Sequence, residues 1–239
     1  MSLKDYFSNP PAKASDVSFS LRNELLPVLS SMKWNVKGIL LEDNSVISVP
    51  AESRAVTAIL QSMAVIRLKA WAKKKGVELE DLVHDTRGYP DLALTNGPFG
   101  SKLIAIDIKS ARHGEGDDVS RMTLGTYDGY FLHPSERKLH GGERSYNDYS
   151  EHWVVGFIYD WNPTKKTSEM VNITDVVVGQ KWQFASRSSG SGDTANMGGV
   201  DSLQRLRSLS GDFASEREFE KYWRDYAVSH PRKRTRKPK

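Results

Sequence analysis

Two acidic residues and a lysine stand in short apolar stretches and could together perform metal-dependent chemistry. Asp107 and Lys109 lie in IAIDIKS, residues 104–110, and Asp91 opens DLAL directly after Pro90. Because side chains alternate along a strand, Asp107 and Lys109 share one face while isoleucines occupy the other. Buried charges of this kind are costly unless they are paired or bound to a metal.

The interval between the two carboxylates suits a shared metal site. TNGPFGS, residues 95–101, separates the two stretches and has the glycine and proline of a turn. A hairpin-like return would bring Asp91 and Asp107 to the same end of a sheet, where their oxygens could hold Mg²⁺ and leave positions for water and phosphate. Lys109 would then lie beside the attacking water and assist its deprotonation. The pattern predicts phosphodiester hydrolysis, although an isolated Asp-x-Lys triplet more often forms a surface ion pair.

Composition restricts the class of protein. The chain has 239 residues, of which 38% are hydrophobic and 27% charged, and this is enough for one domain with a sizeable core. It has no cysteine, which excludes disulfides, thiolate-bound zinc and cysteine nucleophiles. No apolar run approaches the roughly 20 residues of a membrane span and no signal peptide is apparent, so we expect a cytoplasmic protein. The histidines lack the spacing of a zinc site, and we expect them at surface or hinge positions.

The excess of positive charge lies at the C-terminal end of the sequence. Residues 231–239 hold six Lys or Arg and no acid, which leaves 28 basic and 30 acidic side chains in residues 1–230. Such a tail suits a polyanion such as nucleic acid, although a solubilising end has the same composition. We expect a flexible N-terminal extension over 1–19, a domain over 20–230 and the basic tail over 231–239.

Hydrophobic periodicity predicts a mixed α/β fold around one sheet. The longest predicted helix should form the core, with an apolar face of Val56, Ile59, Leu60, Met63, Ile66 and Ala70. The predicted elements, in chain order, are a helix over 20–33 interrupted near Pro27, a hairpin over 36–50, the core helix over 52–75 closed by Gly76, strands over 90–94, 102–110 and 152–161, a loop over 185–199 and a helix over 215–228.

YPDLAL followed by IAIDIKSA resembles the Pro-Asp…Asp-x-Lys signature of the PD-(D/E)XK nucleases, and the chain is similar in particular to the EcoRV-like type II restriction endonucleases. The resemblance covers roughly residues 20–226. It implies a restriction-endonuclease-like core with a central mixed β-sheet flanked by helices, and a homodimer that cuts both strands of a short palindromic double-stranded DNA site with Mg²⁺. Further segments resemble the family in the same order: TLGTYDGY at 123–130, HWVVGFIYDWNPTKK at 152–166, SGSGDTANMGG at 189–199 and SEREFEKYWRDY at 215–226.

The resemblance also assigns roles to the residues of the site. It implies that Asp91 and Asp107 bind metal and that Lys109 is the catalytic lysine. Where the family has a carboxylate on its core helix, this chain has Gln61. An amide can hold a metal or its water but adds no charge, and a polar side chain at the edge of a core helix would have the same pattern.

By the same resemblance, a glycine-rich stretch reads bases in the major groove of DNA. Asp193 in this stretch replaces an asparagine of the family, and aspartate accepts hydrogen bonds but cannot donate to adenine N7. Either the site therefore differs from GATATC at its outer A·T pair, or Asp193 makes a single bond or is protonated or rotated. The residues expected to contact DNA are Ser189, Gly190, Ser191, Gly192, Asp193, Thr194, Ala195 and Asn196 in this stretch, Thr86 and Arg87 on the minor-groove side, and Arg54 and Thr123 at phosphates.

We expect central, blunt cleavage that leaves 5′-phosphate ends, and a companion DNA methyltransferase that protects the host genome. Two alternatives remain open. The first is a repair nuclease or junction resolvase on the same core, against which the glycine-rich stretch argues. The second is a DNA-binding relative whose catalysis has lapsed, which Gln61 favours and the intact Asp91, Asp107 and Lys109 disfavour.

Overall fold

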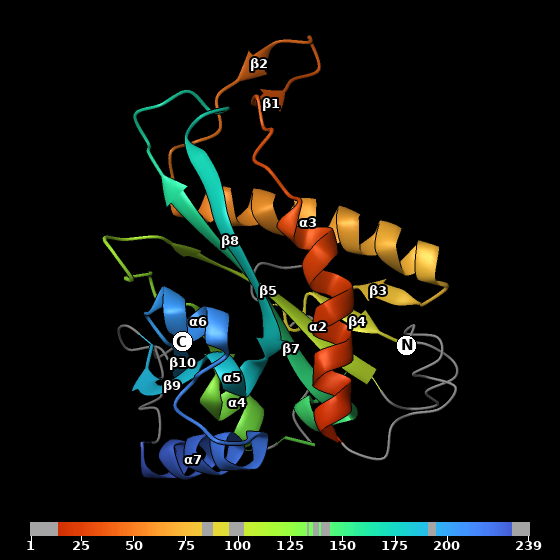
Figure 1. Ribbon diagram of the computed structural model, residues 1–239, viewed down its shortest axis with the longest axis vertical. Coiled ribbons are helices and arrows are strands. Elements are labelled where there is room, and N and C mark those ends of the chain that lie inside the picture. The colour runs from red at the N-terminus through yellow and green to blue at the C-terminus, as the bar shows by residue number, and fades with distance from the viewer. Residues whose placement is uncertain are drawn as a thin grey trace, which may run out of the picture.

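The computed structural model describes residues 14–82, 88–95, 103–132, 134–135, 139, 144–190 and 195–230, and its centre is a mixed β-sheet (Figure 1). Neighbouring strands of this sheet are antiparallel except for one parallel pair, the third and the fourth. In spatial order the strands are β3 (Leu79–Asp81), β4 (Leu92–Leu94), β5 (Leu103–Arg112), β7 (Tyr149–Trp161) and β8 (Val171–Gln180).

Strand β5 is buried on both faces, which explains its unbroken apolar sequence. Ile104, Ile106 and Ile108 point to one hydrophobic cluster, whereas Ala105 and Ala111 point to a second cluster on the opposite face. The sheet is thus the middle of three layers, and the predicted mixed α/β class is confirmed.

Helices α2 (Ala14–Ser30) and α3 (Ser53–Lys75) cover the first face of the sheet (Figure 1). Leu21, Leu25 and Leu29 recur at every fourth position of α2 and are fully buried. Pro27 lies inside this helix, so the predicted interruption is wrong; the buried leucines offset the hydrogen bond that proline cannot donate. The helix also begins within the segment 1–19 that we expected to be flexible.

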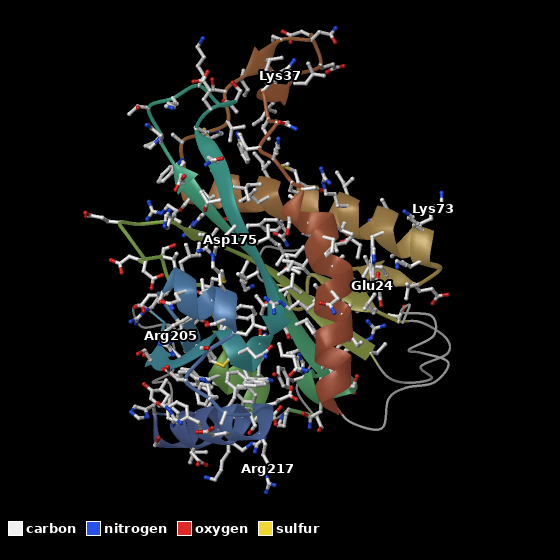
Figure 2. All side chains as sticks on the ribbon, viewed as in Figure 1. Glu24, Lys37, Lys73, Asp175, Arg205 and Arg217 are labelled. Carbon is white, nitrogen blue, oxygen red and sulfur yellow. The ribbon has the colours of Figure 1, made fainter. Side chains whose placement is uncertain are left out.

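Helix α3 ends as the sequence predicts, because Gly76 adopts the left-handed conformation with φ of 66° and caps it. Its buried stripe includes Val56, Leu60 and Leu68, whereas Ile66 is 68% exposed and was wrongly placed in the core. By length and composition alone α3 could cross a membrane, but this stripe packs on the sheet as in a soluble core. Figure 2 shows Lys73 projecting outward from its last turns.

A second sheet and several short helices cover the opposite face. The expected loop over 185–199 is wrong, because two strands occupy most of it and leave only residues 191–194 outside the described part. The small sheet has the order β6 (Thr123–Thr126), β10 (Asn196–Gly199) and β9 (Ala185–Ser189). The helices of this side are α4 (Tyr127–Phe131), the 3₁₀ helix η2 (Tyr146–Asp148), α5 (Lys181–Phe184), α6 (Leu203–Ser208) and α7 (Glu216–Ser229).

Helix α7 has the predicted amphipathic form. Ser215 caps it by accepting a hydrogen bond from the backbone N–H of Glu218. Phe219 and Trp223 lie on the inner side of the helix and are buried. Figure 2 shows Arg217 pointing outward from its other side.

The predicted hairpin is also confirmed, and it stands away from the body of the molecule beyond α3 (Figure 1). It consists of β1 (Ile39–Leu40) and β2 (Val46–Ile47), with Asn44 in the left-handed conformation of a tight turn. All four strand residues are exposed although all are apolar.

Candidate active site

Asp91 lies directly before β4 and faces Asp107 on β5. In the antiparallel ladder Leu92 pairs with Ile106, so continuing the register by one residue places Asp91 opposite Asp107. The hairpin-like return that the sequence predicts is therefore present, and it brings the two carboxylates together.

The Asp91 carboxylate is held by donors from two elements. Gln61 on α3 donates from Nε2 to Oδ1 at 2.6 Å, and the backbone N–H of Ile108 donates to Oδ2 at 2.5 Å. In this structure Gln61 therefore acts as a hydrogen-bond donor that orients Asp91, a role that only contact geometry could reveal.

Asp107 and Lys109 share one side of β5, as alternation predicts. Lys109 donates from Nζ to Asp107 Oδ1 at 2.6 Å. The Asp107 side chain is 1% exposed and that of Lys109 is 25% exposed, so the lysine reaches from a buried carboxylate toward solvent. The second oxygen, Asp107 Oδ2, is buried and has no hydrogen-bond partner among the described residues.

A second lysine, Lys181, approaches Asp107 from the interior, and sequence reasoning missed it. It begins α5 directly after β8, and its Nζ lies 3.8 Å from Asp107 Oδ2. The ammonium also lies over two aromatic rings, 3.8 Å from the ring centre of Tyr89 and 4.9 Å from that of Tyr130. A lysine two residues after the apolar run VVVG of β8 was the available signal, but no motif marks it.

His152 extends this polar network deeper into the fold. It is buried, stacks on Tyr146 with ring centres 3.7 Å apart, and its Nδ1 lies 2.6 Å from the hydroxyl of Tyr89. Burial and the nearby charge of Lys181 hold the pKa of His152 well below its ordinary value, so the ring is neutral. The expectation of a surface or hinge position is wrong for this histidine.

Burial and mutual repulsion shift the ionisation of the site. Burial, followed by the charge of Asp107, raises the pKa of Asp91 to about 7. Burial also lowers the pKa of Lys181 to about 7, although the negative charge of Asp107 opposes this shift. For Lys109, burial acts downward, but Asp107 and Asp91 outweigh it and raise the pKa above its ordinary value. Lys109 is therefore an ammonium at neutral pH.

The donor set fits a hard divalent cation. Asp91 and Asp107 supply carboxylate oxygens at one place, and Asp107 Oδ2 accepts no hydrogen bond from the described residues. No group of three or more His, Cys, Asp or Glu able to hold a metal occurs in the described ranges. Mg²⁺ accepts such a site, because it commonly uses one or two carboxylates and completes its shell with water and phosphate.

The described residues expected to contact DNA come from α3, from β6 and from the β9–β10 hairpin. Arg54 is exposed in the first turn of α3, and Thr123 is exposed at the start of β6. Gly190 and Asn196 close the β9–β10 hairpin through a backbone hydrogen bond of 2.6 Å, with Ser189 and Ala195 beside them. The remaining candidates lie outside the described residues: Thr86, Arg87, Ser191, Gly192, Asp193 and Thr194.

Comparison with known proteins identifies the class. The family model for restriction endonuclease EcoRV matches residues 30–239. The type II restriction enzyme EcoRV of Escherichia coli is 26% identical over 223 residues, which cover 87% of this chain and 89% of the relative. Among solved structures, the NlaIV restriction endonuclease superposes with a TM-score of 0.51 at 15% identity over 91% of this chain and 80% of its own, a likeness of fold. The chain belongs to the EcoRV family of restriction endonucleases and is a type II restriction endonuclease that cleaves DNA at specific sites.

Proposed function

We propose that the enzyme hydrolyses one phosphodiester bond in each strand of a short palindromic duplex, with Mg²⁺ held by Asp91 and Asp107. The observation that carries this proposal is the strand register, which sets the two carboxylates opposite each other with Lys109 bonded to one of them. When bound, Mg²⁺ would supply Lewis acidity toward the phosphate and lower the pKa of a coordinated water.

The side chains of the site would orient the water, stabilise charge and hold the carboxylates in place. Lys109, bonded to Asp107, would orient the attacking water and either aid its deprotonation or stabilise the charge that develops on the phosphate. Gln61 and the Ile108 amide keep both oxygens of Asp91 in place. The water would attack the phosphorus in line and displace the 3′ oxygen, so the products would carry 5′-phosphate and 3′-hydroxyl ends.

The active form in this proposal is a homodimer, and the hairpin of β1 and β2 supports it. Ile39, Leu40, Leu41, Val46 and Ile47 are all 41% exposed or more, and such a group of apolar side chains is unfavourable in water. Covering it with the same hairpin of a second copy gives a two-fold axis, and two-fold symmetry matches a palindromic site.

The proposed recognition site is GATATC or a related hexamer, cut centrally to give blunt ends. The glycine-rich tip between β9 and β10 would read the bases, and Asp193 would decide the outer base pair. We further propose that the protein works in the cytoplasm beside a DNA methyltransferase that modifies the same site.

Digestion of unmethylated phage DNA tests the proposal. Purified protein is incubated with Mg²⁺ or with EDTA, and the fragment ends are sequenced. Discrete fragments that require Mg²⁺ are expected, and their ends report both the site and the base that Asp193 reads. Nicking of branched DNA alone would favour a junction resolvase. If the wild-type protein binds DNA without cleaving it, and the Asp91→Ala variant binds equally well, the result would favour a DNA-binding relative whose catalysis has lapsed.

A further inference from the structure

The Asp107 carboxylate lies between two lysines that differ in their access to water. Lys109 bonds to Oδ1 and is 25% exposed, whereas Lys181 faces Oδ2 and is 2% exposed. Lysine is almost never fully buried without a reason, because desolvating its ammonium costs several kcal/mol. The mechanism proposed above uses Lys109 and leaves Lys181 without a task.

Lys181 also contacts the segment that carries the other carboxylate. Its Nζ lies over the ring of Tyr89, which is separated from Asp91 only by Pro90. Tyr89 is fixed in turn by its hydroxyl, which pairs with His152 Nδ1 at 2.6 Å. One amino group therefore touches β5 at Asp107 and the chain just before β4 at Tyr89.

We propose that Lys181 is a positioning residue that fixes the Asp107 carboxylate relative to Asp91 from the buried side. Only the expected effect of Lys181 on cleavage rests on the proposed function. Lys181 is too deeply buried to meet a DNA phosphate, and Asp107 Oδ2 has no hydrogen-bond donor in the described structure that would orient it in its place. A lysine that only stabilised the fold could be replaced by an apolar side chain of similar volume.

The first test is Lys181→Met, with Lys75→Met as the matched control. Lys75 forms a 2.7 Å ion pair with Glu24 between α3 and α2, away from the site. We expect Lys181→Met to lower kcat about a hundredfold at saturating Mg²⁺, with KM for DNA unchanged within about threefold, because a small misplacement of reacting groups has an effect of this size. Lys75→Met should keep wild-type kcat and KM.

Hydrogen exchange supplies a readout that does not depend on activity. The Ile108 amide bonds to Asp91 Oδ2 and so reports the relative position of the two carboxylate segments. In metal-free Lys181→Met its exchange should be about tenfold faster or more, while the Asn162 amide, bonded to Met170 at the far end of β7 and β8, stays unchanged. If wild type does not cleave, the proposed function fails and this measurement still tests Lys181.

Chemical rescue separates positioning from folding, because the chain has no cysteine. Lys181→Cys is unfolded, alkylated with 2-bromoethylamine to restore an amino group of lysine length, and refolded. A parallel sample receives iodoacetamide, which gives a neutral adduct of similar length, and wild type passes through the same steps.

The aminoethylated protein should regain kcat and slow Ile108 exchange to within about threefold of wild type, and the neutral adduct should regain neither. The proposal is overturned if Lys181→Met cleaves like wild type, if both adducts are equally active, or if the neutral adduct fails to refold while the aminoethyl adduct does.

Discussion

The two faces of the central sheet differ in whether they bury charged side chains. Under α2 and α3 the core packs aliphatic side chains such as Leu25, Leu60 and Leu68 with tryptophan, phenylalanine and tyrosine rings. The opposite face buries the charged groups of Asp107 and Lys181, and Lys181 lies over the rings of Tyr89 and Tyr130. Both faces contribute stability through buried apolar area, but the second also carries desolvated charges, which are costly unless they are paired or used in chemistry.

Asp107→Asn should give the largest difference between the effect on cleavage and the effect on stability. Removing this charge deletes a proposed metal ligand, and the relief of its repulsion with Asp91 should offset the lost pairing with Lys109 and Lys181. We expect cleavage to fall about a thousandfold or more, with no loss of thermal stability in metal-free protein. Single-turnover cleavage and calorimetry measure the two effects, and a clear drop in Tm would contradict the assignment of function to this face.

Leu68→Ala, on the face under α2 and α3, should lower stability and leave cleavage unchanged. Truncating a fully buried leucine is expected to lower the free energy of unfolding by about 2–5 kcal/mol, while cleavage per folded molecule stays unchanged. Ile66→Ala on the same helix, at a position 68% exposed, is the control and should change stability by less than about 0.5 kcal/mol. Urea titration of both variants decides whether the stripe is placed correctly.

Gln61→Ala should have a smaller effect, because it removes one of the two donors to Asp91 while the Ile108 amide remains. Cleavage should fall about tenfold and stability by about 1 kcal/mol, the usual contribution of one hydrogen bond. Full activity in this variant would show that the Ile108 amide alone orients Asp91.

The smallest predicted effect concerns pH. Burial, followed by the charge of Glu220, raises the pKa of Glu216 on α7 from 4.5 to about 7. The folded state then binds more protons than the unfolded state between these pH values, so this group's contribution to stability is lost as pH rises from 4.5 to about 7. Asp91 acts in the same direction, so Glu216→Gln should flatten the decline without abolishing it. Thermal unfolding of metal-free protein from pH 4 to 8 measures the difference.

The sequence predicted the elements whose signal is local. Periodicity and Gly76 located α3, alternation placed Asp107 beside Lys109, and Ser215 marked the start of α7. Pro27 was misread because tertiary packing of α2 outweighs a local preference that the sequence alone displays.

The candidate site was predicted only in part, for a physical reason. A pattern in the sequence shows residues close together along the chain or joined by a short turn. Lys181 lies 74 positions beyond Asp107 and reaches it only because β8 and α5 fold back over β5 and β7. His152 was misplaced likewise, since its burial depends on Tyr146 and Tyr89, which come from separate segments.

The antiparallel register of β4 and β5 has a consequence for divergence within such enzymes. Because Asp91 and Asp107 face each other through pairing of the two strands, their relative position does not depend on how many residues join the strands. Insertions and deletions between residues 95 and 103 can therefore accumulate without moving the carboxylates. A shift of one residue in the pairing itself would turn Asp91 toward the apolar core under α2 and α3 and end the chemistry in a single step.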